Sequence, residues 1–246
     1  MDQAALTLNG YQIEAVRTDR TKHVGNGFDL PILGLFGETG SLLSEVKKKQ
    51  RDSRSYLGYE QSVIEEMGDV LWYLAVIADH AGLSLASIAG LAQTGGQGAI
   101  QESSDFGFLA LQPQQTLPLN APTVAFERTL LELAGAVGRL AEGGTQALGS
   151  AAERGNVAGK LAVVFKVLLA AANEASVTLD QAASANLKKA GDRWPKNRSF
   201  LTIFDCDFPV EEQMPRSLTV DIFEREAKNG RHTLFNAVME SISVIV

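Results

Sequence analysis

Four acidic residues in the first third of the chain have the types and the spacing of a metal site. Glu66 and Asp69 are three residues apart, so on a helix they share one face. Glu38 and Glu45 are seven residues apart, which is two helical turns, and share a face in the same way. Apart from its acids, the segment from Val63 to Ala78 is almost wholly apolar, so its carboxylates are costly to bury unless a cation lies among them. Because Mg²⁺, or Mn²⁺ in its place, prefers carboxylate oxygens, the sequence predicts a divalent metal held by these four residues.

Two long helices are expected to carry the acids. The first runs from Pro31 to Lys49. The second runs from Glu60 to Ala81, where Gly82 ends it, and its apolar residues recur at helical spacing. Shorter helices are expected on either side, one from Asn9 as the N-cap to about Arg20 and one that follows Ser84.

The pattern of the first half returns later in the chain. Residues 133–142 resemble residues 35–44 at an offset of 98 (135 minus 37), with both glycines in register. Residues 160–165 and 173–179 resemble residues 66–71 and 79–85 at an offset of 94 (160 minus 66). Such self-similarity predicts two copies of one helical unit. The second copy lacks the acids, since the positions of Glu38, Glu66 and Asp69 hold Ala136, Lys160 and Val163.

The second copy has a polar and basic stripe that the first copy lacks. Asn186, Lys189 and Arg193 are spaced at i, i+3 and i+7, so they share one face of a helix that ends before Pro195. One copy would supply carboxylates and the other a cationic stripe. We therefore expect the two halves to form a single composite site in each chain.

The predicted organisation has four parts. Residues 1–93 form the copy with the acids, residues 94–120 form a linker rich in glycine, glutamine and proline, and residues 121–200 form the degenerate copy. Residues 201–246 contain alternating apolar residues and the dipeptide Asn229-Gly230, which predict a small C-terminal β-hairpin appendage.

The totals exclude several classes of protein. A net charge of −7 over 246 residues argues against a nucleic-acid-binding surface. The single cysteine, Cys206, cannot form an intrachain disulfide, which fits a reducing cytosol. We expect no signal peptide, because Asp2 and Gln3 follow Met1 where a basic segment would stand, and no apolar run reaches the length of a membrane span. We expect a soluble cytoplasmic protein.

With these residues in view, the first copy resembles the MazG-like all-α nucleoside triphosphate pyrophosphohydrolases. The shared features are a Gly-Glu-x-Gly segment at Gly37 to Gly40, the Glu66-x-x-Asp69 motif, and the Asn-x-x-Lys-x-x-x-Arg helix end at Asn186 to Arg193. The departure is Ser41, where the family usually has a second glutamate; Glu45 lies one turn further on the same face. The resemblance covers residues 9–93 and, in weaker form, 130–195.

The resemblance implies an all-α fold, a MazG-like four-helix-bundle pseudodimer built from two tandem copies. It implies Mg²⁺-dependent cleavage of a nucleoside triphosphate to the monophosphate and pyrophosphate. Glu38 or Glu45 would orient the attacking water. Asn186 belongs to the substrate-binding stripe, in which Lys189 and Arg193 would meet the outer phosphates. The cluster that begins at Lys47 is an alternative phosphate contact, and Trp72 and Tyr73 would contact the base.

Other interpretations stay open. Trp72 also fits a core position, and Lys47 to Lys49 also fit a solvated helix end. The alternative function is a catalytically weak nucleotide-sensing or scaffold protein that retains the fold, which Ser41 and the degenerate second copy favour. The expected partner is a nucleoside triphosphate, with neither nucleic acid nor membrane, and the chain would be a monomeric pseudodimer or a homodimer.

Overall fold

The computed structural model describes residues 6–19, 21, 28–94, 122–142 and 151–193. The chain divides into two compact units, Met1–Gly191 and Asp192–Val246. Nearly all described residues belong to the first unit. The predicted linker and the predicted β-hairpin appendage lie outside the described residues.

The described part of the chain is all-α, as the sequence predicts, and contains no strand. Its helices are α1 (Leu8–Val16), α2 (Asp29–Asp52), α3 (Tyr59–His80), α4 (Leu85–Gln93), α5 (Val124–Ala141), α6 (Ala151–Glu174) and α7 (Leu179–Arg193), with a 3₁₀ turn at Ser53–Ser55.

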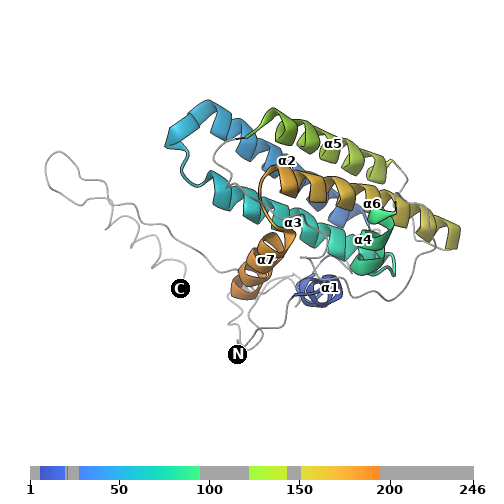
Figure 1. Ribbon diagram of the computed structural model, residues 1–246. Helices are drawn as coiled ribbons and strands as arrows, with labels where there is room; N and C mark the ends of the chain where they lie inside the picture. The colour runs from blue at the N-terminus through green and yellow to red at the C-terminus, as the bar shows by residue number, and fades with distance from the viewer. Residues whose placement is uncertain (1–5, 20, 22–27, 95–121, 143–150, 194–246) are drawn as a thin grey trace, which may run out of the picture. The chain divides into compact units, whose positions relative to one another are not determined.

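The four longest helices, α2, α3, α5 and α6, run side by side and bury one apolar core (Figure 1). Helix α2 packs against α3 and α5, while α6 packs against α5, α4 and α3. The core is filled by side chains that recur at helical spacing on each helix, such as Leu35 and Leu42 on α2, Met67 and Leu74 on α3, and Phe165 on α6. This packing fixes which face of each helix points toward the core, and therefore the direction in which the neighbouring side chains point.

Helix α1 begins earlier than the sequence suggested. Its N-cap is Thr7, whose hydroxyl accepts a hydrogen bond from Gly10 N at 3.0 Å, and Asn9 lies inside the helix. The prediction of Asn9 as the N-cap was wrong, because the helix already includes the buried Leu8, which precedes Asn9. The helix ends at Val16 rather than near Arg20.

Two turns show the same backbone geometry 94 residues apart (176 minus 82). Gly82 after α3 has φ +67°, and Ser176 after α6 has φ +53°. Leu83 N donates to Ala78 O at 2.8 Å, and Val177 N donates to Ala172 O at 2.9 Å, so the same hydrogen bond closes both helices. This spacing equals the offset of the sequence repeat in this region.

One described helix is long and apolar enough to cross a membrane, Ala152–Glu174, and the bent pair α3 and α4 passes the same test together. In the structure, α6 packs against α4 and α5 and contributes buried residues to the core. The core helix of a soluble bundle has the same length and composition.

Candidate metal centre

Three acidic side chains from two neighbouring helices converge at the middle of the α2–α3 pair. Glu38 comes from α2, and Glu66 and Asp69 come from α3. One carboxylate oxygen of each lies within 4.8 Å of one from each of the other two, and all three side chains are half-buried. This spacing lets a single cation contact all three carboxylates, and the oxygen donors suit Mg²⁺.

The surroundings of Glu66 raise the cost of ionising its carboxyl group. Burial, the charges of Glu38 and Asp69, and a hydrogen bond with Glu38 raise the pKa of Glu66 to about 7. Without a metal, Glu66 is therefore partly protonated at neutral pH. A divalent cation would supply the missing positive charge, so the residues present fit a metal.

Helix α7 brings two polar side chains of the second half to Asp69. The Asn186 amide donates a hydrogen bond to Asp69 Oδ1 at 2.9 Å. Lys189 Nζ lies 2.5 Å from Asp69 Oδ2 and 2.7 Å from Glu65. Partial burial lowers the pKa of Lys189, but the bonds to Asp69 and Glu65 outweigh it and the pKa is raised. Acids of the first half and polar residues of the second half thus share one site.

The contact between α7 and α3 depends on a glycine. A Cβ atom at Gly68 would lie 2.5 Å from Ala182 O and 3.0 Å from the Asn186 Cβ. Any larger residue at this position would push α7 away from Asp69. Sequence reasoning missed this role, although a glycine inside an apolar helix, between Glu66 and Asp69, is itself a signal of close packing.

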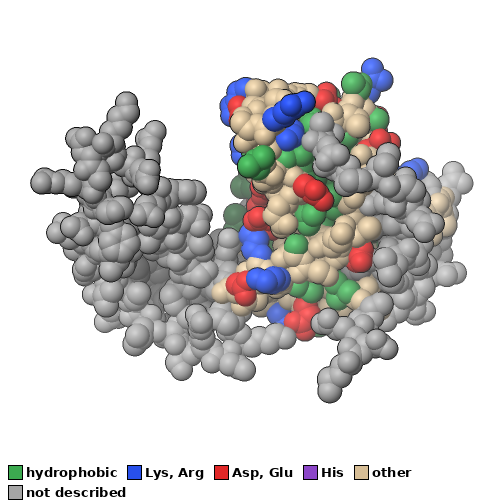
Figure 2. All heavy atoms as spheres, turned by 60° about the vertical axis from the view of Figure 1, so that its left-hand side comes forward, with side chains coloured by type: hydrophobic (Ala, Val, Ile, Leu, Met, Phe, Trp, Pro, Cys, Tyr) green, Lys and Arg blue, Asp and Glu red, His purple; other side chains and the backbone are tan. Residues whose placement is uncertain are grey.

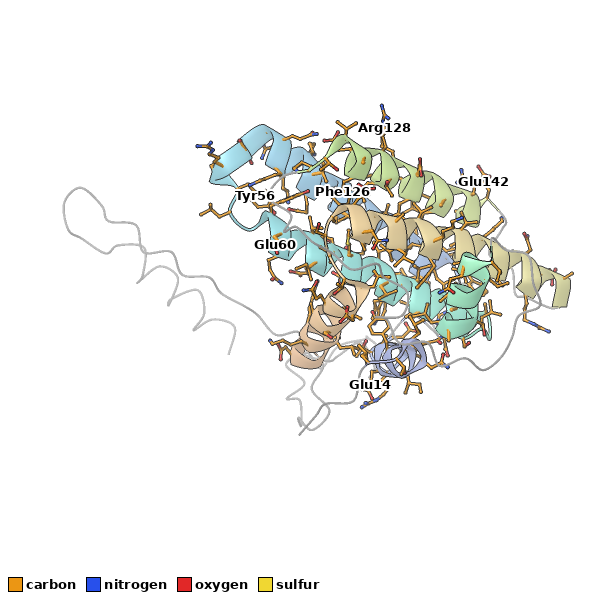
Figure 3. All side chains as sticks on the ribbon, in the orientation of Figure 1. Glu14, Tyr56, Glu60, Phe126, Arg128 and Glu142 are labelled. Carbon is orange, nitrogen blue, oxygen red and sulfur yellow. The ribbon has the colours of Figure 1, made fainter. Side chains whose placement is uncertain are left out.

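Glu45 lies in a different set of contacts. Its side chain is buried, with a relative exposure of 4%, and it accepts hydrogen bonds from the Tyr56 hydroxyl and, at 2.5 Å, from Lys48 Nζ. The Tyr56 hydroxyl also bonds to Ser62 at 2.9 Å. Figure 3 shows Tyr56 at the end of the α2–α3 hairpin. The structure therefore does not bring Glu45 together with the three clustered acids.

The two aromatic candidates have different surroundings. The indole N–H of Trp72 donates to Ala15 O at 3.1 Å and to the Thr18 hydroxyl at 3.0 Å, which fastens the end of α1 to α3. Tyr73 stacks edge-on against Trp72 with ring centroids 4.8 Å apart. Its ring lies against Gly34 of α2, where a Cβ atom would come within 2.1 Å of the ring. Tyr73 therefore lies against α2 one helical turn beyond Asp69, whereas Trp72 joins two helices.

The remaining candidates are dispersed. Lys47 is exposed on α2, while its neighbour Lys49 donates to Tyr56 O at 2.9 Å and stabilises the α2–α3 connection. The side chain of Arg193 lies outside the described residues, although its backbone ends α7. Ser41 is half-buried on α2 and offers no carboxylate to the cluster.

Comparison with known proteins gives one sequence relative. Over 85 residues the chain is 32% identical to the Gene 37 protein of Mycobacterium phage L5, an alignment that covers 32% of this chain and 75% of the phage protein. This chain belongs to the family of that phage protein. The relative's name states no activity, so membership in the Gene 37 family carries none to this chain. No family model and no solved structure matches the chain.

Proposed function

We propose that this chain is a Mg²⁺-dependent nucleoside triphosphate pyrophosphohydrolase with a MazG-like fold. The observation that carries the proposal is the convergence of Glu38, Glu66 and Asp69 within 4.8 Å, with Asn186 and Lys189 bound to Asp69 from the other half of the chain. The resemblance of Glu66-x-x-Asp69 to the MazG-like motif supports the same reaction class.

In the proposed reaction, water attacks the α-phosphorus and the bond to the bridging oxygen breaks, so that pyrophosphate leaves with the electron pair. Glu38, Glu66 and Asp69 would hold the metal. When bound, Mg²⁺ neutralises phosphate charge and lowers the pKa of a coordinated water. Glu38 is the acid we assign to orienting the water, because Glu45 is engaged with Tyr56 and Lys48.

The substrate would bind on the side of the cluster formed by α7. The ammonium group of Lys189 already lies among carboxylates. Because the Lys189 side chain is flexible, its ammonium group can exchange these carboxylates for phosphate oxygens. Arg193 continues the same helical stripe beyond Lys189. Tyr73 is the aromatic residue that we assign to the base, because the indole N–H of Trp72 is already used to hold α1.

Two observations favour the second candidate function. In this alternative, the chain is a catalytically weak nucleotide-sensing or scaffold protein. Ser41 stands where the MazG-like pattern has a carboxylate, and the ammonium group of Lys189 is a cationic partner of Asp69. A protein of this kind would bind a nucleotide through the same residues and release no product.

Partners and location follow from the same proposal. The chain would act on free nucleotides in the cytoplasm, as a monomeric pseudodimer or a homodimer, away from nucleic acid and membranes. Figure 2 shows acidic and basic side chains interspersed over the described residues of one face, which suits this assignment better than a polyanion-binding surface.

The deciding experiment measures pyrophosphate release from a panel of ribo- and deoxyribonucleoside triphosphates with Mg²⁺ and with EDTA. We expect release that requires Mg²⁺ and is lost in Asp69→Asn. Nucleotide binding by calorimetry without any release would favour the sensing function. Neither binding nor release across the panel would contradict both.

A further inference from the structure

A buried chain of hydrogen bonds leads from α1 to the metal centre. The Tyr11 hydroxyl donates to Asn186 Oδ1 at 3.0 Å, and Asn186 Nδ2 donates to Asp69 Oδ1 at 2.9 Å. Tyr11 has no exposed surface and Asn186 is only 5% exposed. Three helices that are distant in the sequence therefore meet in one line of polar atoms.

The orientation of the Asn186 amide is held from both ends. An asparagine side chain can turn its amide by half a rotation, and only one of the two orientations presents the N–H group to a carboxylate. The Asp69 carboxylate can only accept, so it takes the amide N–H group, and the Tyr11 hydroxyl holds this orientation by donating to the amide oxygen. Burial, and then the charge of Asp69, raise the pKa of Tyr11 well above its usual value, so the hydroxyl remains a donor.

The burial of Asn186 also changes its role. A side chain that is 5% exposed and has both ends bonded within the protein is poorly placed to contact a substrate. Lys189, by contrast, has a side-chain exposure of 31% and holds the other oxygen of Asp69. One oxygen of the carboxylate is thus held by a rigid neutral donor and the other by a flexible cation.

We infer that Tyr11 is a positioning residue for the metal ligand Asp69 and that it acts through Asn186. The inference rests on the proposed function, since it assigns Asp69 to the metal. Partners of this kind orient a ligand before the metal arrives, and their loss typically weakens metal binding by about 10–100-fold. Asn186 belongs to this support rather than to the substrate contacts.

The test is titration of the full chain with Mn²⁺ alone, by calorimetry, in the wild type and in Tyr11→Phe. The substitution keeps the ring and removes only the donor. We expect the dissociation constant to rise by on the order of tenfold. Tyr59→Phe is the matched control, because Tyr59 is equally buried on α3 and its hydroxyl has no hydrogen-bond partner among the described residues. Its affinity for Mn²⁺ should equal that of the wild type.

A double-mutant cycle with Asn186→Ala separates positioning from simple stability. Either substitution should weaken Mn²⁺ binding, and the two together should weaken it no more than Asn186→Ala alone, because both break one chain. A purely structural tyrosine would lower the unfolding temperature and leave the Mn²⁺ affinity of the folded protein unchanged. Should Tyr11→Phe fail to fold, Asn186→Ala must by itself show the loss, and wild-type affinity there would overturn the inference.

The outcomes also separate the inference from the proposed function. A wild-type chain that binds no Mn²⁺ would overturn the metal centre, and the inference with it. Wild-type affinity in Tyr11→Phe, beside a wild type that binds the metal, would overturn the inference alone.

Discussion

The two halves of the chain place corresponding positions in different surroundings. Glu66 and Asp69 are half-buried on α3, and Asp69 is covered by Asn186 of α7. At the corresponding positions of α6, Lys160 is half-buried and Val163 has a relative exposure of 46%. The helices of the second half therefore form without acids at these positions.

The short helices that end each half explain the difference. Helix α4 packs on α6 through an almost wholly buried apolar surface that includes Leu85 and Ile88. Helix α7 meets α3 through Gly68, Asn186 and Lys189 instead. Both short helices contribute buried residues to the core, but α7 also brings polar partners to charged groups. Carboxylates can be half-buried only where such partners arrive.

The largest expected effect comes from removing an acid of the cluster in the first half of the chain. Glu66→Gln or Asp69→Asn should reduce turnover by at least on the order of 100-fold, because each removes a metal ligand. The metal-free protein should remain folded, since fewer like charges are then held together. Steady-state pyrophosphate release and circular dichroism provide the two measurements.

The control for that experiment lies at the corresponding position of the second half. Lys160→Gln should leave turnover unchanged. A comparable loss there, or near-wild-type activity in Asp69→Asn, would show that the active site is not in the first half.

A second experiment tests the close approach of α7. Gly68→Ala should destabilise the protein by about 1–3 kcal/mol, because its methyl group would overlap Ala182 O. Gly159→Ala on α6 is the matched control: no atom lies within 4 Å of its added Cβ, so helix propensity should stabilise the protein by up to about 1 kcal/mol. Urea unfolding of both variants measures the difference. Equal effects of the same sign would mean that the two helices are equally open at these positions.

The third prediction restores the acid that the MazG-like pattern has and this chain lacks at position 41. Ser41→Glu should strengthen Mn²⁺ binding by on the order of tenfold, because it adds a charged ligand one turn from Glu38. The control is Arg139→Glu, at the position of the second half that corresponds to Ser41. It should leave the affinity for Mn²⁺ unchanged. Calorimetric titration decides, and unchanged affinity in Ser41→Glu would mean that position 41 points away from the cluster.

The smallest expected effect concerns pH. Glu66 has a raised pKa of about 7 in the folded metal-free protein, against its ordinary value of 4.5. The folded state therefore holds more protons than the unfolded chain between these values, and its stability falls as the pH rises through this window. The affinity for Mn²⁺ should rise over the same window, because the ligands lose their protons.

Thermal unfolding in EDTA at pH 5 and pH 8 tests this effect, which should amount to on the order of a few degrees. Glu66→Gln should remove most of it. Glu60→Gln is the control, because Glu60 is an exposed glutamate near the start of the same helix (Figure 3). A pH response that persists in Glu66→Gln would assign the raised pKa to another acid.

The sequence predicted the helices well because their signals are local. The periodicity of α3 and the cap at Ser84 need only neighbouring residues, and the structure has both: the Ser84 hydroxyl accepts from Ser87 N at 3.1 Å. Helix ends were less predictable: the N-cap of α1 is Thr7, two residues before the predicted Asn9, and both residue types cap helices well. The all-α class follows from this local information.

The candidate site was harder to predict because its contacts are distant in the sequence. Glu66 and Asp69 stand out by their spacing, but the surroundings of Glu45 depend on Tyr56, which only the fold of the α2–α3 connection brings near. The partnership of Tyr11 with Asn186 joins residues 175 positions apart, for which a single sequence offers no periodic signal. Residue spacing alone could not distinguish a carboxylate of the acidic cluster, such as Asp69, from one that bonds to a tyrosine, as Glu45 does.

The partners of Asp69 also have a consequence for the order in which the protein is made. Asn186 and Lys189 follow Asp69 by 117 and 120 residues, so a ribosome releases the acidic helices long before it has made the residues that accompany them. During that interval α3 already carries its charges but lacks α7. The acidic cluster proposed to hold the metal is therefore among the last parts of the first unit to be completed, and a chain that stops short of residue 186 has the acids without Asn186 and Lys189.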